Sequence, residues 1–303
     1  MSVGFSTFAS MFRQNYEVYP RHVLCVLGSG LDFDVVEKVV AEVGGPGFSV
    51  DLEHFQQAHD PRMPRSFDAS LANVSFTESD WGAVETHDSV VYVLSPPMRQ
   101  NNAFDLHRRV MVGHGDGVFE EVWDRTFDVS RRMLAVTAAL LRSGATAAKG
   151  ESSGLAHGRE RWLTLADRAA EARDREMLAV ILFHAWVKRP LLDGSLLKSC
   201  GMHLLGAPDV QIDIGSPAGK PLPATLVGEV VDLIDEVALY LLTERRAREM
   251  SDGEGYRSTP DGPRWIMERH PCLGYEEDSF FFNPYGYWRF TPDEPSTSTP
   301  AEP

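Results

Sequence analysis

The sequence predicts an α+β fold: a mixed central sheet with helices packed on it, plus a C-terminal strand extension. Short apolar runs rich in β-branched residues, at His22–Leu27 and Ser89–Leu94, are typical of strands. Longer segments at Phe119–Leu141 and Ala224–Glu244 place apolar residues at helical spacing, as amphipathic helices do. These strands and helices alternate irregularly, which favours an α+β or mixed α/β architecture.

The N-terminal part predicts a strand, a tight turn, a helix and a second strand. The uninterrupted apolar character of His22–Leu27 indicates a strand that is covered on both faces. Gly28-Ser29-Gly30 closes this strand and leads into a helix at Asp32–Val43, which ends at Gly44-Gly45. Phe48–Leu52 can form the next strand.

The central part of the chain has weaker patterns. His54–Asp80 reads as loop, and Pro96-Pro97 stop the strand that precedes them. The sequence predicts a short helix at Phe104–Val112 and a short strand at Ala145–Lys149.

The second half begins with Ala179–Val187, reading AVILFHAWV, which is the strongest strand signal in the chain and is ended by Pro190. Val210–Ile214 alternates Val and Ile, predicted to face inward, with Gln and Asp, predicted to face outward. After the amphipathic helix, Arg245–Pro263 is charged and rich in glycine, which indicates a linker or an exposed loop.

Two terminal strands are predicted at Arg264–His270 and Phe280–Phe290, with Asn283–Gly286 as a turn. The aromatic side chains of this region are predicted to be core. The alternative is that tyrosines serve as exposed anchors for a protein partner, because aromatic residues are enriched at binding hot spots. The tyrosines concerned are Tyr275, Tyr285 and Tyr287.

These patterns predict the domain organisation. Residues 1–244 form one α+β domain, in which a subdivision near residue 142 stays open. Residues 245–290 form an extension that packs back on the main body through Trp265, Phe281 and Trp288. Residues 291–303, with four prolines and no basic residue, are predicted to be a disordered tail.

Composition excludes several classes of partner. The 303 residues include 44 acidic and 29 basic side chains, for a formal charge of −15. This charge disfavours binding to nucleic acid or to an anionic membrane, since both need a cationic face. No signal peptide and no apolar stretch of the ~18–20 residues that a membrane span needs are visible, so we expect a cytoplasmic protein. Three widely spaced cysteines, Cys25, Cys200 and Cys272, indicate buried thiols in a reducing compartment.

The densest group of polar side chains lies in the segment 147–162, which reads AAKGESSGLAHGRERW. A nucleophile, a base and an orienting acid could be drawn from Ser153, His157 and Glu151, although they are too close in sequence for a standard triad. The structural interpretation is favoured: the hydroxyls of Ser152 or Ser153 satisfy turn amides, and Glu151 pairs with a following arginine. The arginines in reach are Arg159 and Arg161.

Three other patterns predict no cofactor or metal site. Gly28-Ser29-Gly30 lacks the third glycine of a dinucleotide loop, because position 33 is Phe. His114 in GHGDG has no second histidine at metal-ligand spacing. In EHFQQAHD, which carries Glu53 and Asp60, His54 and His59 are five residues apart, so a helix would not place them on one face.

Three stretches together resemble a widespread bacterial family of unknown function. The Trp-Val step at Trp186 is followed by a segment similar to the family's Thr-x-Gly-[Leu/Met]…Gly-x-Pro-[Asp/Glu] pattern, with Ser199 or Cys200 where Thr is usual. Gly144–His157 is similar to the family's Ser-Ser-x-x-Ala-His turn, and His22–Val43 fits its opening half. The matching residues of the second pattern are Gly201, Met202, Gly206, Pro208, Asp209 and Val210.

The resemblance, which covers Arg21–Thr243, implies a role beside type VI or contact-dependent toxins, where small acidic proteins act as immunity factors. The partner would then be a basic protein toxin bound without a cofactor. Alternatives are a hydrolase that uses Glu151, Ser153 and His157, and a chaperone or adaptor for an exported effector. The contact surface is expected on acids of the long helix and on the polar turn: Glu229, Asp232, Asp235 and Glu236, with Glu151, His157 and Arg159.

Overall fold

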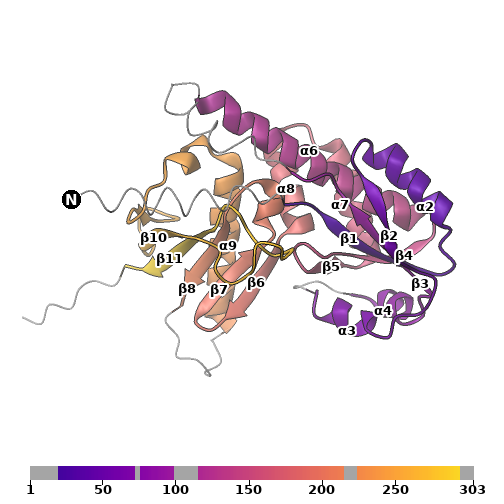
Figure 1. The fold of residues 1–303 in the computed structure, drawn as a ribbon. Coiled ribbons are helices and arrows are strands. Elements are labelled where there is room, and N and C mark those ends of the chain that lie inside the picture. The colour runs from indigo at the N-terminus through magenta and orange to yellow at the C-terminus, as the bar shows by residue number, and fades with distance from the viewer. Residues whose placement is uncertain (1–19, 72–75, 99–114, 215–223, 294–303) are drawn as a thin grey trace, which may run out of the picture.

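The computed structural model describes residues 20–71, 76–98, 115–214 and 224–293. Its helices and strands form the predicted α+β class, but the strands make two sheets where one central sheet was expected (Figure 1). The predicted helix at 104–112, His114 and most of the predicted tail lie outside the described residues.

The first sheet has the strand order β2-β3-β1-β4-β5, and every neighbouring pair is antiparallel. The strand β1 lies at its centre and is buried along its whole length, as predicted from its uninterrupted apolar run. The strands are β1 (Val23–Gly28), β2 (Ser49–Gln56), β3 (Ser89–Leu94), β4 (Ala145–Gly150) and β5 (Leu155–His157).

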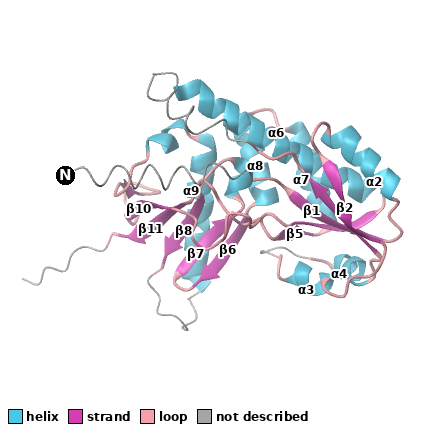
Figure 2. Cartoon of the chain, in the orientation of Figure 1, coloured by secondary structure: helices cyan, strands magenta, loops and turns pink. Residues whose placement is uncertain are grey.

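Alternate side chains of β1 enter two different cores. Leu24 and Val26 join the main apolar core, whereas Cys25 and Leu27 join a smaller core that includes Phe67. Helices above the sheet cover the first face, and two short helices cover the second (Figure 2). The helices above are α2 (Phe33–Val39), α6 (Gly115–Arg142) and α7 (Arg159–Glu171); the short ones below are α3 (Met63–Asp68) and α4 (Glu78–Glu85).

The second sheet has the order β6-β7-β8-β11-β10-β9. Its β8–β11 pair is parallel, and its other pairs are antiparallel. Helix α9 (Ala224–Thr243) packs on one face, and α8 (Arg175–Trp186) lies between α9 and α6. The strands are β6 (Lys188–Asp193), β7 (Leu196–Cys200), β8 (Asp209–Asp213), β9 (Gly255–Tyr256), β10 (Trp265–His270) and β11 (Tyr287–Pro292).

Several local predictions are confirmed. The strand Ser89–Leu94 has the predicted bounds, and α6 and α9 contain the two predicted amphipathic helices. Gly28–Gly30 forms the predicted turn before α2, whose first amides are capped by Asp32, since its Oδ1 accepts from the Asp34 amide at 2.9 Å. A π-helical turn, η1 (Val40–Gly44), ends this helix.

The strand predicted at Ala179–Val187 is wrong, because this segment belongs to helix α8. Asp174 caps the helix by accepting from the Met177 amide at 2.8 Å. The helix is enclosed by its neighbours and buries side chains on several faces, including Phe183 and Trp186. A helix that is apolar nearly all round has no polar stripe, so its sequence cannot be distinguished from that of a buried strand by periodicity.

Smaller differences have similar causes. The predicted loop 54–80 contains the end of β2, helix α3 and the start of α4, whose first turn is held by a capping box of Thr77 and Asp80. Gln211, expected to face outward, is 6% exposed because Arg289 of the neighbouring β11 donates to its Oε1. Only the last part of the predicted strand 280–290 is in β11, and Asn283–Gly286 forms the predicted turn.

The segment after residue 245 is part of the second sheet. It begins with a 3₁₀ turn, η3 (Arg245–Glu249), and then adds β9, β10 and β11 beside β8. Trp288 and Phe290 of β11 enter the main core together with Val210 and Ile212 of β8. The second sheet therefore depends on strands from both sides of α9.

Candidate functional site

The predicted polar turn connects β4 to β5, and Ser152 in it has a structural role. Its Oγ accepts a hydrogen bond from the Val23 amide at 2.9 Å and donates one to the Arg21 carbonyl at 2.7 Å. The neighbouring Glu151 amide donates to the Val23 carbonyl at 2.7 Å. The turn thus satisfies the backbone groups at the start of β1, as the structural interpretation expects of a serine in this segment.

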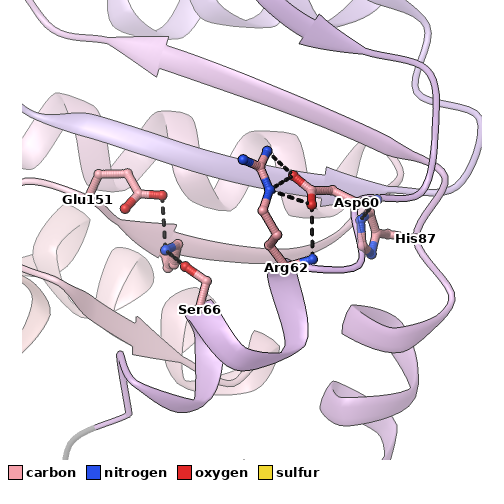
Figure 3. A network of polar contacts seen from close by, with 6 residues as sticks. Asp60, Arg62, Ser66, His87 and Glu151 are labelled. Atoms are coloured by element: carbon pink, nitrogen blue, oxygen red, sulfur yellow. Dashed lines mark hydrogen bonds and ion pairs between the residues drawn. The ribbon is translucent and has the colours of Figure 1, made fainter.

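The carboxylate of Glu151 pairs with Lys149, and not with Arg159 or Arg161 as predicted. The Lys149 Nζ lies 3.0 Å from Glu151 Oε1 and donates to Ser66 Oγ of α3 (Figure 3). The Lys149 side chain is only 4% exposed, so this carboxylate neutralises a buried ammonium group. The pair therefore attaches α3 to the first sheet.

A second polar group in the same view involves Asp60, Arg62 and His87 (Figure 3). The Arg62 Nη2 donates to Asp60 Oδ2 at 2.7 Å, and these hydrogen bonds hold the pKa of Asp60 down at about 2. The Asp60 amide donates to the Nε2 of His87, and the Nδ1 of the same ring donates to the Val84 carbonyl. Both ring nitrogens of His87 therefore form hydrogen bonds with backbone groups.

The two histidines of EHFQQAHD have separate partners. His54 contacts Asp51 at 2.8 Å, and the His59 ring contacts the backbone carbonyl of His87 at 3.1 Å. Within the residues that the structure describes, no group of three or more His, Cys, Asp or Glu side chains is arranged to hold a metal ion.

His157 lies inside the molecule and presents no surface to a partner. It is 4% exposed, its Nε2 donates to the Ala185 carbonyl at 3.3 Å, and its ring packs edge-on against Trp162 at 4.6 Å. Burial lowers the pKa of His157 to about 4, so the ring is neutral at pH 7. The nearby Ser153 Oγ is buried without a hydrogen-bond partner. The three members of the hydrolase hypothesis thus have different surroundings and are not hydrogen-bonded to one another.

Arg159 anchors the start of α7. Its amide donates to Asp80 Oδ1 at 2.9 Å, and its guanidinium donates to the Leu141 carbonyl at 2.7 Å. The second bond satisfies a free carbonyl at the end of α6. Arg159 therefore joins α7 to α4 through its amide and to α6 through its half-buried side chain.

The acids of α9 fall into two groups. Glu229, Asp232 and Glu236 are exposed, and Glu236 accepts a hydrogen bond from the Tyr256 hydroxyl at 2.9 Å. Asp235 instead forms a bidentate pair with Arg189, with Nη2 at 2.8 Å from Oδ2. No lysine or arginine lies near these acids in sequence before Arg245, and Asp235 has a basic partner because β6 brings Arg189 against the helix.

Two buried histidines that the sequence did not single out lie between the sheets. The Nε2 of His22 donates to Ser130 Oγ at 2.8 Å, and its ring packs edge-on against Trp186 at 4.5 Å. His203 is 1% exposed, and backbone groups of Phe280 and Ser152 near its ring oppose part of the pKa shift that burial causes. Burial lowers the pKa of His22 to about 3 and that of His203 to about 4.

Asp209, matched above only through the family pattern, is a fully buried carboxylate. It accepts hydrogen bonds from Ser199 Oγ at 2.9 Å, the Met202 amide at 3.2 Å and Asn283 Nδ2 at 2.7 Å. Burial raises the pKa of Asp209 to about 6, and these donors oppose the shift. The carboxylate therefore joins the end of β7 and the backbone after it to the loop before β11.

One small surface cavity of about 140 Å³ lies where the turn after β1 meets the end of α6. It is lined by residues of both, including Ser29, Asp32, Leu140 and Gly144. Ligand pockets commonly measure about 300–1,000 Å³, so this cavity is small for a substrate site. Among the described helices, none has the length and apolar character that a membrane span requires.

Comparison of the chain with protein-family models, with curated proteins and with solved structures returned no match. Lys149, His22 and His203 were missed because isolated buried polar residues have no local pattern. For Lys149 one signal existed. Residues two apart at a strand end share a face, and Glu151 stands two residues after Lys149, so this spacing could have predicted the ion pair.

Proposed function

We propose that this protein is a non-catalytic cytoplasmic binding protein of the immunity type, which neutralises a secreted antibacterial toxin by direct contact. The observation that carries the proposal is its acidic surface. The chain has a formal charge of −15, and Glu229, Asp232 and Glu236 are exposed along one helix. Acids on a surface accelerate association with a basic protein by electrostatic steering.

The polar turn supports the same proposal because its bonds weaken the hydrolase alternative. Ser152, Glu151 and Arg159 make bonds that hold strands and helices together, and His157 is buried. Three residues of the motif thus have structural roles. The Ser153 Oγ and the His157 Nδ1 have no hydrogen-bond partner, but the two residues are 1% and 4% exposed, so neither is open to a substrate.

The test is co-expression of this protein with the product of each gene that flanks its own gene. We expect one flanking product to be basic and toxic, and this protein to restore growth and to form a complex with it in size-exclusion chromatography. The proposal is overturned if no flanking product is toxic, or if growth is restored without complex formation.

Two matched variants separate binding from catalysis. Asp232→Lys should weaken the complex about tenfold, whereas Glu37→Lys, an equally exposed acid on α2, should leave it unchanged. Ser153→Ala should protect as well as the wild type. Loss of protection by Ser153→Ala in a folded protein would favour the hydrolase instead.

A further inference from the structure

The loop 271–286, between β10 and β11, is long and lacks regular secondary structure, yet it is held from within (Figure 1). Its ends are fixed by a small apolar cluster of Cys272, Phe282 and Tyr287. The Tyr275 ring packs against Phe281 at 5.4 Å, and Lys198 of β7 lies 5.7 Å from the Tyr275 ring centroid. Loops longer than about 12–15 residues in a compact domain are uncommon and are usually functional or disordered, and this one is ordered.

The polar turn and the Gly-x-Pro-Asp segment both contact this loop. At Gly154, in the polar turn, an added Cβ would lie 3.3 Å from the Phe281 ring, and the backbone there has φ +61°. In the Gly-x-Pro-Asp segment, Asp209 accepts from Asn283 Nδ2 at 2.7 Å, and the same amide nitrogen donates to the Ala207 carbonyl. The buried aspartate therefore fixes the loop through Asn283, and the missing side chain at Gly154 leaves the Phe281 ring room to pack beside the polar turn.

The side chains that the loop exposes have a different character from those that anchor it. Leu273 is 82% exposed and Phe280 is 50% exposed, which makes them prominent apolar groups on the described surface. Between them in sequence lie three exposed acids, Glu276, Glu277 and Asp278. Single exposed apolar side chains are common on protein surfaces, and what distinguishes these two is that both lie on one loop whose other aromatic side chains and Asn283 hold it against the body.

We infer that the loop 271–286 is the contact loop for the basic protein partner, with Leu273 and Phe280 as apolar anchors and the three acids as the complementary charge. The inference rests on the proposed function and adds a second contact surface to the exposed acids of α9. A loop that is already ordered loses little conformational entropy on binding, so its contacts contribute more fully to affinity. The acids act mainly on the association rate. The apolar anchors, which become buried in the complex, act mainly on the dissociation rate.

The experiment measures binding of full-length variants to the purified toxic product of the flanking gene by surface plasmon resonance, which gives the association rate, the dissociation rate and Kd. Leu273→Ser and Phe280→Ser should each raise Kd at least tenfold, mainly through faster dissociation. Leu52→Ser is the matched control, since Leu52 on β2 is 64% exposed and lies outside the loop. Glu276→Lys combined with Glu277→Lys should slow association at least tenfold at low salt.

A second measurement needs no substitution. Amides across 272–282 should exchange more slowly in the wild-type complex than in the free protein. If the complex forms but these amides are not protected, and both loop variants bind within twofold of the wild type, the inference is overturned and the proposed function stands. If the wild type binds no flanking product, both are overturned.

Discussion

Ser152 and Ser153 are adjacent residues of the same type with different surroundings. The Ser152 hydroxyl connects two backbone groups at the start of β1, whereas the Ser153 hydroxyl is buried without a partner. A sequence pattern treats the two as equivalent. Their contribution to stability depends on which backbone groups the fold places within hydrogen-bond distance.

Ser152→Ala should lower the free energy of unfolding by about 1–3 kcal/mol, because it leaves the buried Val23 amide without its acceptor. Ser153→Ala should change it by less than about 0.5 kcal/mol or stabilise the protein, because the lost hydroxyl satisfies no group. Urea unfolding of both variants measures the difference. Equal effects of the two substitutions would contradict these assignments.

At this scale the sequence predicted the kind of role but not the partners. Serine hydroxyls were expected to satisfy turn groups, and Ser152 does. Glu151 was expected to pair with an arginine, but Lys149 is its partner. A lysine is rarely buried, so its sequence position gives little reason to place it inside, and only the packing of α3 against β4 encloses it.

At the scale of the element, the outcome depends on whether one face of an element meets water. Helices α6 and α9 were predicted because each keeps a polar face, and a moment at 3.6 residues is then visible. Helix α8 was mistaken for a strand because its neighbours α6, α7 and α9 enclose it. The short helices α3 and α4 were missed because few of their residues are buried, which leaves the apolar pattern weak.

The two kinds of acid on α9 give a prediction for this element. Asp235→Ala should destabilise the protein by about 1–3 kcal/mol, because Arg189, whose side chain is 12% exposed, then loses its carboxylate. Asp232→Ala, one turn away and exposed, should change stability by less than about 0.5 kcal/mol. Thermal and urea unfolding test the pair. A neutral Asp235→Ala would show that Arg189 is satisfied elsewhere.

At the scale of the whole molecule, strands distant in sequence complete one sheet. The β8–β11 pair is parallel and joins residues on either side of α9. A chain truncated after residue 244 would expose the apolar faces of β8 and α9 that Trp288 and Phe290 cover. We expect it to be aggregated or unfolded in circular dichroism and analytical ultracentrifugation. A stable, monomeric truncated protein would show that the C-terminal strands are dispensable.

The buried histidines predict how stability changes with pH. His22, His157 and His203 have folded-state pKa values of about 3, 4 and 4, below the value of about 6.5 expected when the chain is unfolded. Between these pKa values the unfolded chain binds more protons than the folded protein does. The contribution of the three histidines to the free energy of unfolding is therefore fully present above pH 6.5 and falls as the pH is lowered. Each histidine contributes roughly 2 kcal/mol of this loss between pH 6.5 and 5.

Asp209 acts in the opposite direction. Because its pKa is raised to about 6, its contribution is present at low pH and is lost as the pH rises through 6. One carboxyl is outweighed by three imidazoles, so we expect a net loss of stability from pH 7 to pH 5 in urea titrations. The slope of unfolding free energy against pH should decrease in His203→Gln, whatever its effect at pH 7. An unchanged slope would mean that His203 is solvated.

Local pattern was sufficient for the α+β class, for the strand 89–94, for the turn at 28–30 and for the two amphipathic helices, because each depends on residues close together in the chain. It was insufficient for the division into two sheets, the parallel β8–β11 pair and the helical state of 175–186. Those features depend on which surfaces bury one another across long stretches of sequence. The same holds for the ordered loop 271–286, which is held by Asp209 and packs its Phe281 ring beside Gly154, both distant from it in the chain.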